Sequence, residues 1–161
     1  MIRKATMEDM PRLREICLAA KAFMRANGNN LQWTEPGFPE DTLPENIARD
    51  ELYVICGEDG VPHALFAFVT GEDPAYGTIY DGDWHSDEPY GTIHRMASDG
   101  VLHGTFAQCV AFCKGMMSHI RADTHELNRP MQHQFEKCGF VRCGTVHLAD
   151  GSPRWAYELW A

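Results

Sequence analysis

The sequence lacks any long hydrophobic run, although 44% of its 161 residues are hydrophobic. The longest strongly apolar stretch is Ala64–Val69, whereas a membrane-spanning helix needs about 20 apolar residues. The opening Met1-Ile2-Arg3-Lys4 leads into polar residues, and not into the apolar region of about 7–15 residues that a secretory signal carries. We therefore expect a cytoplasmic protein with no membrane partner.

Positive charge is also scarce. The chain carries 14 Lys and Arg residues against 23 Asp and Glu, which gives a formal net charge of −9. Proteins that bind nucleic acid usually present a basic patch, so we expect no nucleic-acid partner. The charge is uneven, because residues 1–92 hold 7 basic and 17 acidic residues, whereas residues 93–161 hold 7 and 6. The two parts of the chain are therefore expected to do different jobs.

The cysteines include no C-x-x-C pair, and their spacing predicts no metal site. In a reducing compartment such thiols behave as small buried hydrophobic groups. The chain also lacks internal repeats, low-complexity tracts and linkers, which predicts a single domain over residues 1–161. The six cysteines are Cys17, Cys56, Cys109, Cys113, Cys138 and Cys143.

Turn and cap signals divide the chain into strands and helices. Thr6 followed by Asp9 predicts a helix start, and Asn27-Gly28 predicts its end. Residues 72–91 contain six acids and no Lys or Arg, which predicts a solvated hairpin. We expect strands at about residues 2–5, 52–56, 62–70, 90–97, 120–124, 141–148 and 154–160, and helices at about 6–27, 44–50, 105–117 and 128–138. This order predicts an α/β (α+β) fold, a mixed sheet with helices packed on its faces.

The first candidate site is the strand, loop and helix at residues 93–115. A strand that ends in a Gly-containing loop and turns directly into a helix presents unpaired N–H groups at the helix N-terminus, which suit an anion such as a pyrophosphate. Here the loop is Ser98–Thr105, with Gly100 and Gly104. Glycines at these positions are equally common in a strand-to-helix turn that binds no ligand, so an ordinary turn remains an alternative to an anion site.

The second candidate lies further along the chain. Asn128 opens a helix that closes with Phe135-Glu136-Lys137-Cys138-Gly139-Phe140. An Asn after the fifth strand and a helix ending in a Tyr-Glu-Lys-x-Gly-Phe-like motif are found in the GNAT N-acetyltransferase superfamily, which the chain resembles over nearly its whole length. The resemblance implies a mostly antiparallel sheet, with helices on both faces, that splays apart between its fourth and fifth strands.

The resemblance also implies acetyl-CoA as the acetyl donor, held in the gap between those two strands. Main-chain groups of the fourth strand would pair with the pantetheine arm, and an N–H there would polarise the thioester carbonyl. The following loop would surround the pyrophosphate, and the later helix would lie near the thiol or adenine. The residues that these roles imply are Met96, Ala97, Ser98, Gly100, Val101, His103, Gly104, Thr105, Phe106, Asn128, Met131, Phe135 and Lys137.

The chain departs from the family pattern at several of these positions. The family's loop is Arg-Gly-x-Gly-x-Gly-like, but here the matching residues are His103, Gly104, Phe106 and Gln108. The helix Tyr that often protonates the leaving thiolate is Phe135, and a phenyl ring has no proton to donate. Another group or solvent must then supply that proton, or the protein binds acetyl-CoA without fast turnover.

Acetyl transfer to an amine requires that the ammonium group lose a proton, so groups that titrate near neutrality are sought near the fourth and fifth strands. His94 lies on the fourth strand, on the same side as Met96 and Ser98 if side chains alternate. His125 and Glu126 follow the fifth strand. We therefore take His94, His125 and Glu126 as candidate catalytic residues. Each also has a plainer interpretation, as packing for His94 and as helix caps for the other two.

The acceptor pocket that the resemblance implies is built partly by the loop between the first two helices. Trp33 and Phe38 lie there with Glu35, which would form a lid over a small amine and attract its charge. Alternatively, the two aromatic residues fasten the loop to the core.

Together these features predict an acetyl-CoA-dependent N-acetyltransferase that acts on a small, cationic amine by direct attack in a ternary complex. The acidic part of the chain, residues 1–92, would build the acceptor side. The alternative is a catalytically weak CoA-binding sensor or partner-binding module, which the departures at Phe106, Gln108 and Phe135 favour. An exposed closing strand would allow a homodimer.

Overall fold

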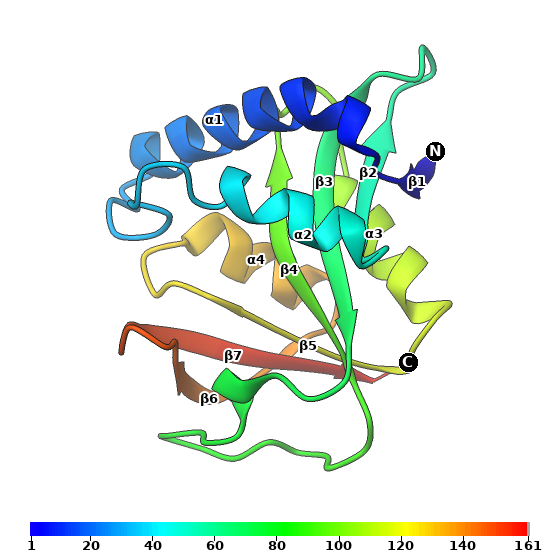
Figure 1. Ribbon diagram of the computed structural model, residues 1–161. Helices are drawn as coiled ribbons and strands as arrows, with labels where there is room; N and C mark the ends of the chain where they lie inside the picture. The colour runs from blue at the N-terminus through cyan, green and yellow to red at the C-terminus, as the bar shows by residue number, and fades with distance from the viewer. Residues whose placement is uncertain (161) are drawn as a thin grey trace.

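The computed structural model describes residues 1–160, in which seven strands form one sheet in the order β1-β2-β3-β4-β5-β7-β6. Every neighbouring pair is antiparallel except β4 and β5, which are parallel (Figure 1). The strands are β1 (Ile2–Lys4), β2 (Leu52–Cys56), β3 (Pro62–Thr70), β4 (Gly91–Ser98), β5 (His119–Thr124), β6 (Val141–His147) and β7 (Pro153–Trp160). The helices are α1 (Met10–Ala26), α2 (Leu43–Ala48), α3 (Thr105–Lys114) and α4 (Arg129–Lys137). The predicted mixed α/β fold is confirmed.

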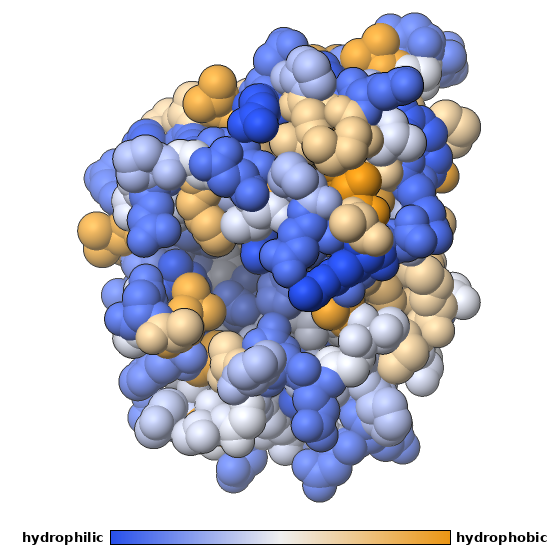
Figure 2. Space-filling model, in the orientation of Figure 1, coloured by the Kyte–Doolittle hydropathy of each residue, from blue (hydrophilic) through white to orange (hydrophobic). Residues whose placement is uncertain are grey.

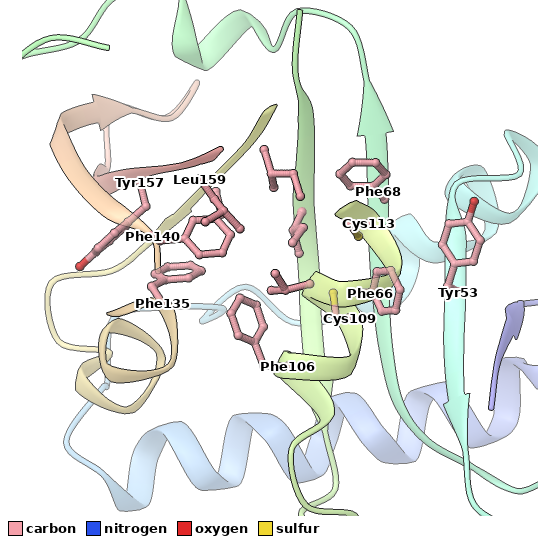
Figure 3. Close-up of a cluster of buried hydrophobic side chains, with 14 of the residues drawn as sticks. Tyr53, Phe66, Phe68, Phe106, Cys109, Cys113, Phe135, Phe140, Tyr157 and Leu159 are labelled. Atoms are coloured by element: carbon pink, nitrogen blue, oxygen red, sulfur yellow. The ribbon is translucent and has the colours of Figure 1, made fainter. Parts of the chain in front are cut away.

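Helices cover both faces of the sheet, because the strand side chains alternate between two cores. Leu65 and Ala67 of β3 are buried with the apolar residues of α1 and with Leu43 of α2. Phe66 and Phe68 point to the other face, where α3 and α4 pack (Figure 3). All six cysteines have free thiols, and only Cys138 is not fully buried, as expected of small hydrophobic groups.

The local signals at the helix ends behave as predicted. The backbone N–H of Thr6 donates to the Asp9 carboxylate at 2.8 Å, just before α1, and a short 3-10 turn over Met7–Asp9 leads into the helix. Asn27 ends α1, and Gly28 follows with a φ of +84°, a conformation that glycine adopts without strain.

Strands β4 and β5 part soon after they begin. Only Gly91 pairs with Ile120 and Thr92 with Arg121, and beyond them β5 turns away from β4 (Figure 1). The remaining length of β4, residues 93–98, is paired with β3 alone. The expected splay is therefore present, and it leaves main-chain groups of β4 free on the side that faces β5.

A bulge in β4 changes which side chains face the splay. Arg95 has a φ of +60°, and the pairing with β3 shifts so that His94 opposes Ala67 while Ala97 opposes Leu65. His94 therefore lies on the α1 face with Ala97, not on the same side as Ser98, which opposes Ala64 in the other core. The alternation assumed from the sequence was wrong, because the extra residue of a bulge resets it.

Two further expectations are corrected. The closing strand β7 lies between β5 and β6 and has no free edge, and the edge strands of the sheet are β1 and β6. Residues 72–88 form no hairpin, because no strand lies between β3 and β4 and Tyr76 of this segment is buried in a cluster with Val146 and Ala156. The acids of the segment are exposed as expected, except Asp73, which is half-buried. No helix among residues 1–160 has the length and apolar character to cross a membrane.

Candidate active site

Two pockets meet where β4 and β5 part. The larger one, of about 420 Å³, runs along the end of β4 to the N-terminus of α3 and is called the β4 groove here. The smaller, of about 170 Å³, is called the inner pocket. It lies between the loop after α1 and the turn that connects β6 to β7. Figure 2 shows the molecule hollowed between its α1–α2 side and its β6–β7 side. The two pockets are adjacent, because four residues line both of them: Met24, Met96, Phe106 and Met131.

Most of the residues that the resemblance implied for the cofactor line the β4 groove. They are Met96, Ala97, Ser98, Gly100, His103, Gly104, Thr105, Phe106, Asn128 and Met131. Phe135 lines the inner pocket, whereas Val101 and Lys137 are exposed and line neither pocket. The sequence missed the contribution of α1, whose Ala20, Phe23 and Met24 close the groove on one side. Nothing in their spacing distinguishes them from other apolar residues of an amphipathic helix.

The groove ends at an N-terminus that suits an anion. Gly104 precedes α3 with a left-handed backbone, at a φ of +69°, and the first hydrogen bond back along the chain runs from Gln108 N to Gly104 O at 3.0 Å. The first N–H groups of a helix have no intrahelical partner and carry the positive end of its dipole. This end of the groove can therefore bind phosphate oxygens through the backbone alone.

Asp99 anchors the loop between β4 and α3. Its carboxylate binds Arg12 of α1 and lies 2.7 Å from His63 Nδ1 of β3, and it also accepts a 2.9 Å hydrogen bond from Val101 N. Burial would raise the pKa of Asp99, but the hydrogen bonds and charges of His63 and Arg12 outweigh burial and lower it. Asp99 therefore stays ionised, and its negative charge is balanced by Arg12 beside the part of the groove that suits an anion.

Asn128 connects the two pockets. Its Oδ1 accepts the N–H of Met131 at 3.2 Å, which caps α4, while its Nδ2 donates to Gln32 Oε1 at 3.0 Å. Gln32 also accepts from Asn29 Nδ2 at 2.9 Å. The loop after α1 is therefore held to α4 by buried amides. Its Trp33 and Phe38 line the inner pocket, and Trp33 also packs against the core beside α1. Glu35 is exposed and lies outside that pocket.

His94 and Asp73 form a pair in the inner pocket. His94 Nε2 lies 3.0 Å from Asp73 Oδ2, and Asp73 Oδ1 accepts the N–H of Ala75 at 2.8 Å. Burial alone would raise the pKa of Asp73, but these two hydrogen bonds and the charge of Arg95 lower it. Because Asp73 is then a carboxylate, it accepts a hydrogen bond from the Nε2–H group, and the lone pair of neutral His94 is on Nδ1.

A second acid of the inner pocket is occupied by a tyrosine. The hydroxyl of Tyr76 donates to Asp123 Oδ2 at 2.6 Å, and Tyr76 itself is buried. Burial and the Asp123 charge raise the pKa of Tyr76 well above its usual value, so it stays protonated. Sequence reasoning missed Asp73 and Asp123, because one lies in the segment taken for a solvated hairpin and the other at a strand end.

Two arginines also line the inner pocket. Arg95, at the bulge, donates through Nε to Thr42 Oγ1 at 3.0 Å and lies over the Phe38 ring at 5.3 Å. Arg154, at the start of β7, is 8% exposed and donates only to the carbonyl oxygen of Pro153, at 2.9 Å. Burial lowers the pKa of each guanidinium, although nearby acids oppose this.

The other candidate catalytic residues lie elsewhere. His125 is buried, and its Nδ1 accepts the N–H of Leu127 at 3.0 Å within the loop before α4, whereas the residue that caps α4 is Asn128. Burial, and then the charge of Arg154, lower the pKa of His125. Glu126 is exposed. Neither residue lines the β4 groove or the inner pocket, so the structure does not bring them together with His94.

Phe135 lies in a close-packed aromatic group. Its ring centroid is 5.4 Å from that of Phe106, 5.2 Å from Phe140 and 4.6 Å from Tyr157. The Tyr157 hydroxyl is on the far side of its ring from Phe106 (Figure 3), and Tyr157 lines neither pocket. This tyrosine therefore does not replace the hydroxyl that position 135 lacks.

Comparison with known proteins gives the class. No protein-family model and no curated protein matches the chain, but solved structures of acetyltransferases match it over its whole length. One is a GNAT-family acetyltransferase from Streptococcus agalactiae 2603, 30% identical, with a TM-score of 0.88 over 100% of this chain and 95% of that one. Another, from Listeria monocytogenes 4b F2365, is 16% identical, with a TM-score of 0.73 over 100% and 94%. A third, the ribosomal-protein-S18-alanine N-acetyltransferase from Escherichia coli, is 13% identical, with a TM-score of 0.63 over 99% and 92%.

The fold and the site thus define an acetyltransferase. The chain belongs to the GNAT family.

Proposed function

We propose that this protein is an acetyl-CoA-dependent N-acetyltransferase whose acceptor is a small amine that enters the inner pocket as an ammonium ion. The observation that carries the proposal is that the two pockets are adjacent and share Met24, Met96, Phe106 and Met131 as lining residues. A donor in the β4 groove and an acceptor in the inner pocket would meet there without leaving the protein. The geometry therefore supports direct attack in a ternary complex.

The β4 groove fits acetyl-CoA. The part of β4 beyond Thr92 offers main-chain groups to the pantetheine amides, because β5 does not pair with it. The N-terminus of α3 and the loop anchored by Asp99 would hold the pyrophosphate. When bound, acetyl-CoA supplies an acetyl group as a thioester, which an uncharged amine can attack.

His94 is the group that would make the amine uncharged. Its Nε2–H is held by the Asp73 carboxylate, which orients the ring and stabilises the imidazolium once Nδ1 has taken a proton. His94 is the one histidine among the described residues that line the inner pocket. We therefore assign it the role of general base, with Asp73 as its positioning residue.

The thiol side of the reaction has no corresponding acid. Phe135 stands at the position of the family's tyrosine and is only 2% exposed. Solvent entering along the open groove would then supply the proton to the departing sulfur. Slow protonation at this step favours the second candidate function, a CoA-binding sensor with little turnover.

Two measurements separate these functions. Thermal unfolding with acetyl-CoA or CoA tests binding, because a ligand at 100 times its Kd adds about 2.7 kcal/mol of stability. Release of free thiol from acetyl-CoA, followed over a panel of amines, tests turnover. We expect stabilisation by both nucleotides and thiol release with at least one amine. Stabilisation without release would establish the sensor, and no stabilisation would exclude both functions.

A further inference from the structure

The acidic side chains of the inner pocket have hydrogen-bond partners in the protein, whereas its two arginines have no acidic partner among the residues that the structure describes. The two acids are engaged, since Asp73 binds His94 and Ala75 N, and Asp123 binds Tyr76. The two arginines, Arg95 and Arg154, are not paired with acids. Among residues 1–160, no carboxylate oxygen lies within 4.0 Å of either guanidinium.

Arg154 is the more unusual of the two. A side chain this deeply buried normally has its charge paired, because an unpaired buried charge loses its hydration without compensation. The negative charges of Asp123 and Asp150 raise the pKa of Arg154, but both carboxylates lie beyond ion-pair distance from its guanidinium. Its one hydrogen bond, to Pro153 O, uses a single N–H of the five that a guanidinium carries.

A second buried group of the pocket also lacks a partner. The Thr124 hydroxyl, at the end of β5, has no hydrogen-bond partner within the described part of the chain. Arg95, on the opposite strand of the splay, uses Nε for Thr42 and leaves its terminal nitrogens without a protein acceptor among residues 1–160. The donors of Arg95 on β4 and Arg154 on β7 that no acceptor among residues 1–160 uses therefore lie around one small cavity, together with the unpartnered Thr124 hydroxyl on β5. This is the arrangement expected where a ligand supplies the acceptor.

We propose that the acceptor carries a carboxylate beside its amine, and that Arg154 and Arg95 bind this carboxylate. The inference rests on the proposed function, which makes the inner pocket the acceptor site. Guanidinium groups bind carboxylates through two parallel hydrogen bonds, and the Thr124 hydroxyl can add a third. The ammonium end of such a zwitterion would lie toward Asp73, Asp123 and His94, where its proton is removed.

The pocket also constrains the rest of the acceptor. Trp33, Phe38 and Leu148 give it apolar walls, so an apolar or aromatic body fits better than a further charge. A dianionic group such as a phosphate ester is disfavoured, because Asp73 and Asp123 line the same 170 Å³. A polyamine is disfavoured as well, since both acids already have partners and both arginines would repel a second cation. The class is therefore a free amino acid or a related amino carboxylate.

The test separates recognition from turnover. Binding of each probe to the CoA-loaded protein is measured by calorimetry, and thiol release from acetyl-CoA is followed in parallel. The probes are the common amino acids, ω-amino acids of increasing length, their amides, and matching amines without the carboxyl group. O-phosphoethanolamine and spermidine represent the disfavoured classes. We expect at least one amino carboxylate to bind 10- to 100-fold more tightly than its amide, and Arg154→Gln to remove that difference.

Controls keep the result interpretable. Arg154→Gln should retain stabilisation by CoA, since Arg154 does not line the β4 groove. Arg154→Lys retains the charge without the paired donors, and Arg95→Gln tests the second guanidinium if Arg154→Gln does not fold. Arg49→Gln removes an exposed arginine that is paired with Glu45 and should change nothing.

The outcomes distinguish this inference from the proposed function. Tight binding of an amino carboxylate without thiol release would support the inference and contradict catalysis. If amines with and without a carboxylate are acetylated at equal rates, and Arg154→Gln does not change those rates, catalysis would be supported and the inference overturned. Preference for the amides, spermidine or O-phosphoethanolamine, or no binding by any amino carboxylate, would also overturn it.

Discussion

His94 Nε2 lies 3.0 Å from Asp73 Oδ2, and this contact joins β4 to a segment that looks like solvated surface in the sequence. The pairing fixes Nε2 as the ring nitrogen that carries the proton in neutral His94 and leaves the lone pair on Nδ1. A histidine oriented in this way by a carboxylate can take a proton from a substrate ammonium near neutral pH.

His94→Ala should lower kcat by about 100-fold, because it removes a general base, and leave the Kd for acetyl-CoA unchanged. Asp73→Asn should lower kcat by a smaller factor, since the amide can no longer stabilise the imidazolium. Steady-state kinetics with an accepted amine, together with acetyl-CoA titration, measure both effects. Glu126→Ala tests Glu126, which the sequence analysis also took as a candidate catalytic residue. If kcat fell in Glu126→Ala and stayed normal in His94→Ala, the general base would be Glu126 and not His94.

Phe135→Tyr should raise kcat, because it adds a hydroxyl at the wall of the inner pocket where a proton donor to the sulfur is missing. The matched control is Phe140→Tyr, which adds the same hydroxyl to the same aromatic group away from both pockets. Each substitution should cost about 1–3 kcal/mol of stability if the hydroxyl finds no partner. Equal kcat in the wild type and Phe135→Tyr would show that protonation of the thiolate does not limit the rate.

Gly104→Ala should weaken acetyl-CoA binding. A Cβ at this position meets no atom within 4 Å, so the cost is the left-handed backbone, about 1–2 kcal/mol. Relief of that strain would move the N–H groups at the start of α3. Gly151→Ala carries the same strain, at a φ of +86°, in the turn between β6 and β7, and should lower the melting temperature without changing the Kd. Equal Kd values for acetyl-CoA in the two variants would show that the N-terminus of α3 does not bind the phosphates.

Asp99→Asn should destabilise the fold by about 2 kcal/mol at neutral pH, because Arg12 and His63 lose a charged partner. The folded-state pKa of Asp99 is lowered, so its stabilising contribution is present above the unfolded pKa near 4 and is lost as pH falls through the folded pKa. The difference in melting temperature between the wild type and the variant should therefore shrink below about pH 4. Asp83→Asn, an exposed acid, is the control and should show no such difference. A difference that persisted at low pH would mean that Asp99 acts through packing alone.

The elements could be predicted because their causes are local. The Thr6 and Asp9 cap, the Asn27-Gly28 stop and the apolar run of β3 each depend on neighbours in the chain, and their positions agree with the structure within a few residues. The residues of the loop after β4 could be placed by resemblance, because strand, glycine and helix follow one another directly. His94 could be chosen only by its chemistry, and the sequence could not show that Asp73 holds it.

What the sequence determined by itself is the order of strands and helices, because it follows from periodicity and caps. The resemblance carried by adjacent motifs pointed to the residues that line the β4 groove. The tertiary structure decided the make-up of the inner pocket. It brought Asp73, Arg95, Asp123 and Arg154 from four separate segments to one cavity, and a single bulge at Arg95 set which face His94 occupies. Pairing between strands and the burial of charge depend on partners far apart in the chain, so no local pattern encodes them.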